Sequence, residues 1–130
     1  MATIQNIQLY DGAPTPVQHT YAPHEDSPNG GLVLADRSNA NPLLWWTLAI
    51  DRPVPKKGAL TRQFIVTANV PYEETNGSTT TIKYVMCRMV MYAPPGAAVQ
   101  VRKNARMIMK NALMDAQVID VLDNGAAFIG

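Results

Sequence analysis

Residues 82–115 have the sequence IKYVMCRMVMYAPPGAAVQVRKNARMIMKNALMD, in which a strand pattern is followed directly by a helix pattern. Side chains alternate between an apolar and a mixed face over Ile82–Tyr92, and Pro94-Pro95-Gly96 ends this predicted strand. Apolar side chains then recur with the helical period, which predicts an amphipathic helix over Ala97–Asp115 and a shorter helix over Val118–Asp123. Terminal helices that follow a run of strands pack across a sheet, their own or a partner's, so the sequence predicts an α+β fold.

Three earlier segments are also predicted to be strands, from their alternation and from the turn signals around them. They lie at residues 32–37, 44–51 and 63–70. The last two of them have one apolar and one mixed face, as expected for an antiparallel sheet that is covered on one side. Pro71 is expected to end a strand, and the polar segment Tyr72–Thr80 is expected to be a loop. Four prolines in residues 13–28 predict an edge strand or a long connection there, and not a central strand.

Composition narrows the classes of function. The chain has 130 residues, which is the size of one domain with a substantial core. Only 16% of the residues are charged, which fits either a surface that contacts another protein or one made polar by Asn, Thr and Gln. The net charge of +1 excludes a strongly basic nucleic-acid tail but not a basic patch. Without a signal-peptide pattern or a membrane-spanning run, we expect a soluble protein made in the cytosol.

The residues that could support catalysis are few. His19 and His24 lie in the proline-rich segment and are expected to be solvated loop residues. Cys87 alternates with apolar positions and is expected to be a buried thiol, and as the single cysteine it excludes an intrachain disulfide. Phosphate-binding, dinucleotide-binding and serine-nucleophile motifs are absent from the sequence. We therefore expect a protein that is not an enzyme, with no metal, cofactor or small-molecule substrate.

The mixed face of the predicted sheet is the main candidate binding surface. It combines aromatic rings with hydroxyl, amide and guanidinium groups, which can stack on unpaired bases and contact base edges and phosphates. The candidate RNA-binding residues are Trp45, Thr47, Lys56, Lys57, Gln63, Thr67, Tyr84, Met86 and Arg88. A second candidate is a basic stripe on the predicted long helix, formed by Lys103, Arg106 and Lys110. From the residues alone, the mixed face is more simply explained as the solvent side of a sheet.

The order and spacing of these segments resemble the coat proteins of single-stranded RNA bacteriophages, the leviviruses. The turn at Asn29-Gly30 leads into a short strand, Trp46–Arg52 looks like the family's fourth strand, and Phe64–Pro71 looks like its fifth. The strand that ends at Ala93-Pro94, followed by two helices, is similar to the end of the family's fold. The resemblance covers nearly the whole chain, most securely Asn29–Gly130.

The resemblance implies one domain, 1–130, with a hairpin and connection at 1–28, a five-stranded antiparallel sheet at 29–93 and two helices at 97–124. Two subunits would pair edge to edge into a ten-stranded sheet, each placing its helices on its partner's sheet. Dimers would form an icosahedral shell around a single-stranded RNA genome, with the mixed face inward and Tyr72–Thr80 at the symmetry axes. The implied dimer interface is Val101, Ala105, Ile108, Ala112 and Leu113.

Individual positions agree with the family's base pocket only in part. Thr47 matches a strand threonine that helps to form the pocket, whereas the companion threonine falls at Ile65 and a lysine falls at Thr67. A stacking tyrosine and an asparagine fall at Met86 and Arg88. The resemblance thus implies a virion protein that packages RNA and keeps the family's binding surface, but without the specific adenine pocket. The alternative is a non-viral, dimeric RNA-binding regulatory protein that forms no shell.

Overall fold

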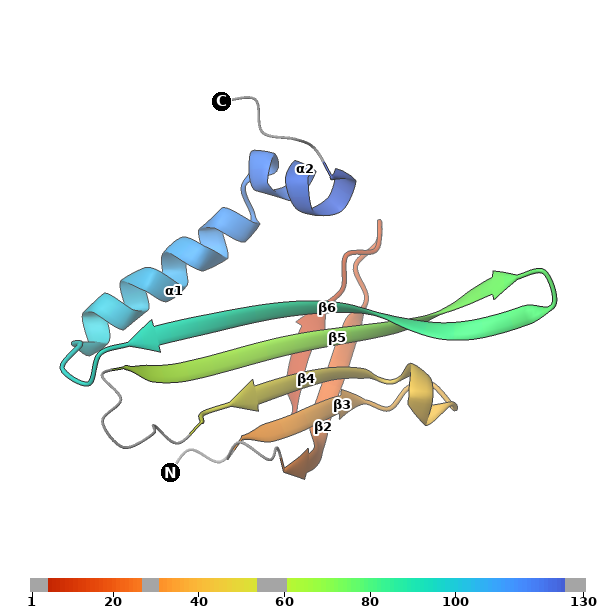
Figure 1. Ribbon diagram of the computed structural model, residues 1–130, viewed down its shortest axis with the longest axis horizontal. Helices are drawn as coiled ribbons and strands as arrows, with labels where there is room; N and C mark the ends of the chain where they lie inside the picture. Colours follow the sequence, from red (N-terminus) through yellow and green to blue (C-terminus); the bar gives the residue numbers. More distant parts are fainter. Residues whose placement is uncertain (1–4, 27–30, 54–60, 126–130) are drawn as a thin grey trace. The chain divides into compact units, whose positions relative to one another are not determined.

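The computed structural model describes residues 5–26, 31–53 and 61–125, which form two compact units, one of strands and one of helices. The strands are β1 (Ile7–Tyr10), β2 (Gln18–Asp26), β3 (Leu32–Asp36), β4 (Trp46–Asp51), β5 (Arg62–Asn76) and β6 (Thr79–Ala93). They form one sheet in sequence order, with the 3₁₀ helix η1 (Pro42–Leu44) between β3 and β4 (Figure 1). The helices α1 (Val99–Leu113) and α2 (Ala116–Asn124) follow. The predicted α+β fold, with strands first and two helices last, is confirmed.

The two faces of the sheet follow from the register of β3, β4 and β5. Leu48 of β4 lies opposite Leu34 and Ala68, while Thr47 lies opposite Ala35 and Asn69. Directly opposed residues of an antiparallel pair share a face, so the apolar and polar sets of β4 and β5 fall on opposite sides as predicted. Leu34 and Ala35 are 0% exposed, which places the core of this unit at the middle of β3.

Strand β2 changes its partner along its length. Gln18–Tyr21 pair with β1, Ala22–Asp26 pair with β3, and the register shifts between Pro23 and Glu25. The strands β1 and β2 (red and orange) consequently run across the direction of β3 to β6 in Figure 1. The predicted hairpin and the predicted five-stranded sheet are both present, and they share β2. The expectation of an edge strand in this region agrees with the pairing, since neither half of β2 is paired on both sides. Pro23 is tolerated there because that half of the strand pairs on one side only.

The hairpin of β5 and β6 is longer than predicted, and the predicted loop at Tyr72–Thr80 is wrong. Both strands have fifteen residues and are joined by a turn at Gly77-Ser78. The Thr75 and Thr80 hydroxyl oxygens lie 3.2 Å apart across the ends of the two strands, within hydrogen-bond distance. Pro71 does not end β5, because β4 pairs with β5 only from Ile65 to Asn69. Beyond Asn69, β5 makes no backbone hydrogen bonds to β4, so the missing N–H of Pro71 breaks no bond of that pair.

Gly77 is expected to be the position in this turn that is most sensitive to substitution. Its φ is +64°, a conformation that costs residues with a Cβ about 1–2 kcal/mol. Gly77→Ala should therefore lower the free energy of unfolding by about that amount, measured by urea denaturation. Gly96→Ala is the matched control, since at both sites a Cβ would meet no atom within 4 Å and only Gly77 has a positive φ. Equal losses in the two variants would contradict this account.

Helix α2 begins and ends at recognisable caps, whereas Ala98, at the N-cap of α1, makes no side-chain hydrogen bond. The predicted helix over Ala97–Asp115 is shorter in the structure, because Asp115 caps α2: its Oδ1 accepts hydrogen bonds from the backbone N–H groups of Gln117 (2.9 Å) and Val118 (3.4 Å). Gly125, with φ of +66°, ends α2 in the left-handed conformation. No helix in the described ranges is long and apolar enough to cross a membrane.

Candidate nucleic-acid interface

The mixed face of β4 and β5 brings hydroxyl and amide groups together. Thr47 lies opposite Asn69, and Ala49 lies opposite Thr67, so the polar groups of two strands alternate within one small area. Gln63 lies farther along β5 on the same face, and all of these side chains are half-buried. The Asn69 Oδ1 atom is buried and has no hydrogen-bond partner in the described part of the chain. Buried acceptors usually have a hydrogen-bond partner, which can be a protein group or an ordered water.

Strand β6 presents the other predicted RNA-binding residues. Tyr84, Met86 and Arg88 alternate along the strand and are exposed, Tyr84 at 59% and Met86 at 63%. The Thr75–Thr80 contact sets the register of the β5–β6 hairpin near its turn. Continued along both strands without a shift, this register puts Met86 opposite Asn69, on the mixed face.

Trp45 precedes β4 and is held by polar neighbours. Its Nε1 donates a hydrogen bond to the backbone oxygen of Asn39 (2.7 Å), and the Arg37 guanidinium lies 5.6 Å from the ring centroid. His24 meets the same ring edge-on at 5.6 Å. Trp45 was predicted as a site residue, but Arg37, which adds a cation beside its ring, was not. The predicted sites Lys56 and Lys57 lie outside the described residues.

The predicted dimer-interface residues lie on α1, which has no buried residue. Val101 is 60% exposed, Ile108 70% and Leu113 45%, while Ala105 is exposed and Ala112 half-buried. Cys87 on β6 is exposed, so the expected buried thiol is wrong for the single chain. Exposed apolar side chains that lie close together are typical of surfaces that bind another molecule.

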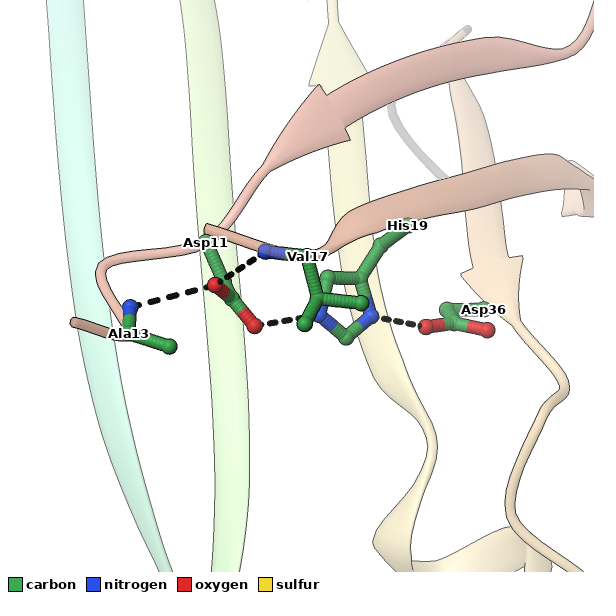
Figure 2. A network of polar contacts seen from close by, with 5 residues as sticks. All are labelled: Asp11, Ala13, Val17, His19 and Asp36. Atoms are coloured by element: carbon green, nitrogen blue, oxygen red, sulfur yellow. Dashed lines mark hydrogen bonds and ion pairs between the residues drawn. The ribbon is translucent and has the colours of Figure 1, made fainter. Parts of the chain in front are cut away.

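A polar cluster within the described residues surrounds His19, which was predicted to be a solvated loop residue. His19 lies on β2, with its Nδ1 2.5 Å from Asp36 Oδ2 and its Nε2 2.8 Å from Asp11 Oδ2 (Figure 2). Its ring stacks on that of Trp46, with centroids 4.4 Å apart. The expectation for His19 is therefore wrong. Its partners are far apart in sequence, so no local pattern indicates them.

These contacts change the acidity of all three groups. Hydrogen bonds to Asp11 and then to Asp36 raise the pKa of His19 above its ordinary 6.5. Hydrogen bonds from the Val17 backbone N–H and then from His19 lower the pKa of Asp11 from 3.8 to about 2. Partial burial opposes the ionisation of Asp36, but hydrogen bonds from His19 and Ser38 outweigh it and lower the pKa of that carboxyl. The favoured state is an imidazolium between two carboxylates.

Comparison with known proteins identifies the family. Residues 2–128 match the family model described as levivirus coat protein. This chain belongs to the levivirus coat protein family. The resemblance found in the sequence is thus confirmed, and the chain is a structural protein of a viral capsid and not an enzyme. No curated protein matches it in sequence.

Solved structures share the fold of this coat protein over its whole length. The virus-like particle of bacteriophage ESE058 has 20% sequence identity and a TM-score of 0.85, covering 98% of this chain and 100% of that chain. The virus-like particle of Beihai levi-like virus 21 has 16% identity and a TM-score of 0.85, covering 99% and 100%. The bacteriophage GA protein capsid has 13% identity and a TM-score of 0.68, covering 98% of both chains.

Proposed function

We propose that this coat protein dimerises, assembles with further copies into a closed shell and encloses single-stranded RNA. The observation that carries the proposal is the family match over residues 2–128, together with full-length similarity to subunits of virus-like particles. Synthesis would take place in the host cytoplasm, and the final location would be the virion.

Dimerisation is supported by the surfaces that the single chain leaves open. The strand β6 is the last in the sheet and has fifteen residues, with Val85 60% exposed and Met86 63% exposed. A long apolar edge strand is a template for pairing with another chain. Pairing β6 with its copy would join two sheets edge to edge. The partner would also cover the apolar stripe of α1, which is formed by Val101, Ala105, Ile108, Ala112 and Leu113.

RNA contact is assigned to the mixed face and β6. Thr47, Thr67 and Asn69 supply donors and acceptors, and the Tyr84 ring is exposed for stacking. Arg88 is exposed on the same strand and supplies a charge for phosphate. Because Ile65 replaces the second threonine of the family's pocket, a base at this site would meet Thr47 and Asn69, which lie directly opposite each other.

Expression of the chain alone should produce particles much larger than a dimer, and those particles should contain RNA. Size-exclusion chromatography and negative-stain electron microscopy measure the assembly, and nuclease protection measures the enclosed RNA. Discrete dimers at every protein and salt concentration tested, with RNA present, would contradict the shell and favour the alternative of an RNA-binding regulator. Empty particles would retain the shell and contradict RNA packaging.

A further inference from the structure

The His19 cluster joins four parts of the strand unit that are separate in sequence. His19 is on β2, Asp11 follows β1, Asp36 ends β3 and Trp46 begins β4. The β1–β2 hairpin otherwise meets β3 through the pairs of Ala22–Asp26, beyond the register shift. The Asp36 contact and the Trp46 stacking therefore hold the first half of β2 to the following strands. The Asp11 contact ties His19 to the turn of its own hairpin, and Figure 2 shows both carboxylate contacts.

The geometry around the ring requires a proton on each nitrogen. A neutral imidazole has one N–H donor and one acceptor nitrogen, whereas an ionised carboxylate only accepts. Both His19 nitrogens lie within hydrogen-bond distance of a carboxylate oxygen, at 2.5 and 2.8 Å. Loss of one proton would leave a nitrogen lone pair facing an oxygen lone pair. It would also remove the positive charge that favours stacking on Trp46.

Asp11 connects this arrangement to the turn of the hairpin. Its Oδ1 accepts hydrogen bonds from the backbone N–H groups of Val17 (2.9 Å) and Ala13 (3.1 Å), while its Oδ2 faces His19. The backbone N–H of Asp11 in turn donates to the Val17 carbonyl oxygen at 3.0 Å. One carboxylate thus closes the turn and binds the imidazolium, so a change at His19 acts directly on the hairpin.

Solvent reaches the cluster from one side. His19, Asp36 and Trp46 contribute to the wall of an open pocket of about 210 Å³, which Ser38, Asn39 and Leu44 complete. The His19 side chain keeps 17% of its surface exposed. Its proton can therefore exchange with bulk water while the surrounding strands remain paired.

The remaining neighbours add no second cation to the cluster within the described residues. On β1, the residue opposite His19 is Leu9, and on β4 the residue that contacts the His19 ring is Trp46. Tyr21, next along the same side of β2, is a phenol whose pKa is raised by burial and then by the two aspartates. The Arg37 guanidinium donates to the Pro23 carbonyl oxygen (3.1 Å) and lies 3.2 Å from His24 Nδ1. His19 is the one titratable cation facing two carboxylates.

We propose that Asp11, His19 and Asp36 form a protonation-dependent latch that holds the β1–β2 hairpin on β3 and β4 and loosens it as the solution becomes alkaline. The pKa of His19 is raised, so its contribution is complete below its ordinary value of 6.5 and is lost as pH rises through the folded value. The pKa values of the two aspartates are lowered, so their contribution is complete above 3.8 and is lost as pH falls through the folded values. The latch is strongest in mildly acidic solution.

Hydrogen exchange of the full chain, in the dimeric or assembled form in which it is purified, tests the latch. Amide protection in β1 and in Gln18–Tyr21, corrected for intrinsic exchange rates, should fall as the pH rises above 6.5, because the pKa of His19 is raised above that ordinary value. The loss should reach up to about tenfold per pH unit in the steepest part. Protection in β4 and β5 is the internal reference and should stay constant over the same range.

Two histidines on one strand provide a matched pair of variants. His19→Gln should weaken hairpin protection at low pH and remove most of its pH dependence, because an amide cannot supply two charged donors on opposite sides. His24→Gln should behave as the wild type. If the His19→Gln variant does not fold, the pH profile of hairpin protection in the wild type is compared with that of Asp36→Asn. The Asp36→Asn change should reduce the pH dependence of this protection. Constant hairpin protection in the wild type, or an equal effect of His24→Gln, would overturn the latch.

Discussion

Replacing Ile108 by Ala should cause a large loss of soluble coat protein. Ile108 is 70% exposed in the single chain, where truncation of a side chain usually changes stability by no more than about 0.5 kcal/mol. If the side chain is buried in a dimer, the same change costs about 2–5 kcal/mol. An obligate dimer has little stable monomer to fall back on, so this cost should appear as lost soluble yield and a lower thermal midpoint.

Met107→Ala is the matched control for Ile108→Ala. Met107 is the preceding residue of α1, is 38% exposed, and lies about 100° around the helix from Ile108, away from the apolar stripe. Its truncation should leave yield and thermal midpoint close to those of the wild type. A well-folded, soluble monomer of the Ile108→Ala variant would contradict the interlocked dimer.

Particles of the Arg88→Ala variant, or of a variant with Thr47→Ala and Tyr84→Ala together, should form normally but contain much less RNA. Stacking of a base on an aromatic ring contributes about 1–3 kcal/mol, and each phosphate contact adds a salt-dependent term. Because a shell repeats the site in every subunit, the losses accumulate over the whole particle. The ratio of absorbance at 260 and 280 nm and the amount of extracted RNA measure the effect.

The basic stripe of α1 is the competing surface. Lys103, Arg106 and Lys110 are exposed and would attract phosphate on charge alone. The proposed arrangement places the helices outside the shell, so changing all three to Gln should leave the RNA content nearly unchanged. Loss of RNA in this triple variant, with full RNA content in the sheet variants, would reverse the assignment of inner and outer surfaces.

The faces of β4 and β5 were predictable because a period of two fixes the side of each residue, and the pairs of Thr47 and Leu48 confirm it. The signal of Pro71 misled for a physical reason, whereas that of Pro23 correctly excluded a strand paired on both sides. Pro23 and Pro71 each lie where the strand has lost the partner on one side, which local sequence does not reveal. The polar hairpin end beyond Pro71 was taken for a loop because a ribbon exposed on both faces has no apolar alternation.

The residues of the candidate sites were less predictable from the sequence than the faces of the strands. Thr47 and Thr67 could be placed on one face from alternation, but their neighbour Asn69 stands out only through its buried, unpartnered oxygen. The His19 cluster could not be predicted, since Asp11 and Asp36 approach it through the folding of three strands. The RNA-binding and dimer-interface residues remain predictions until the variants described above are measured.

The long β5–β6 hairpin has a consequence for the order in which the subunit folds. Its paired residues are close in sequence around Gly77-Ser78, so closing it costs little chain entropy, and hairpins form in about 1–10 μs. The strand β2, in contrast, needs one partner before it and one after it in sequence. The β5–β6 hairpin can therefore form without the N-terminal strands, which gives the subunit a local folding unit next to the helices in sequence.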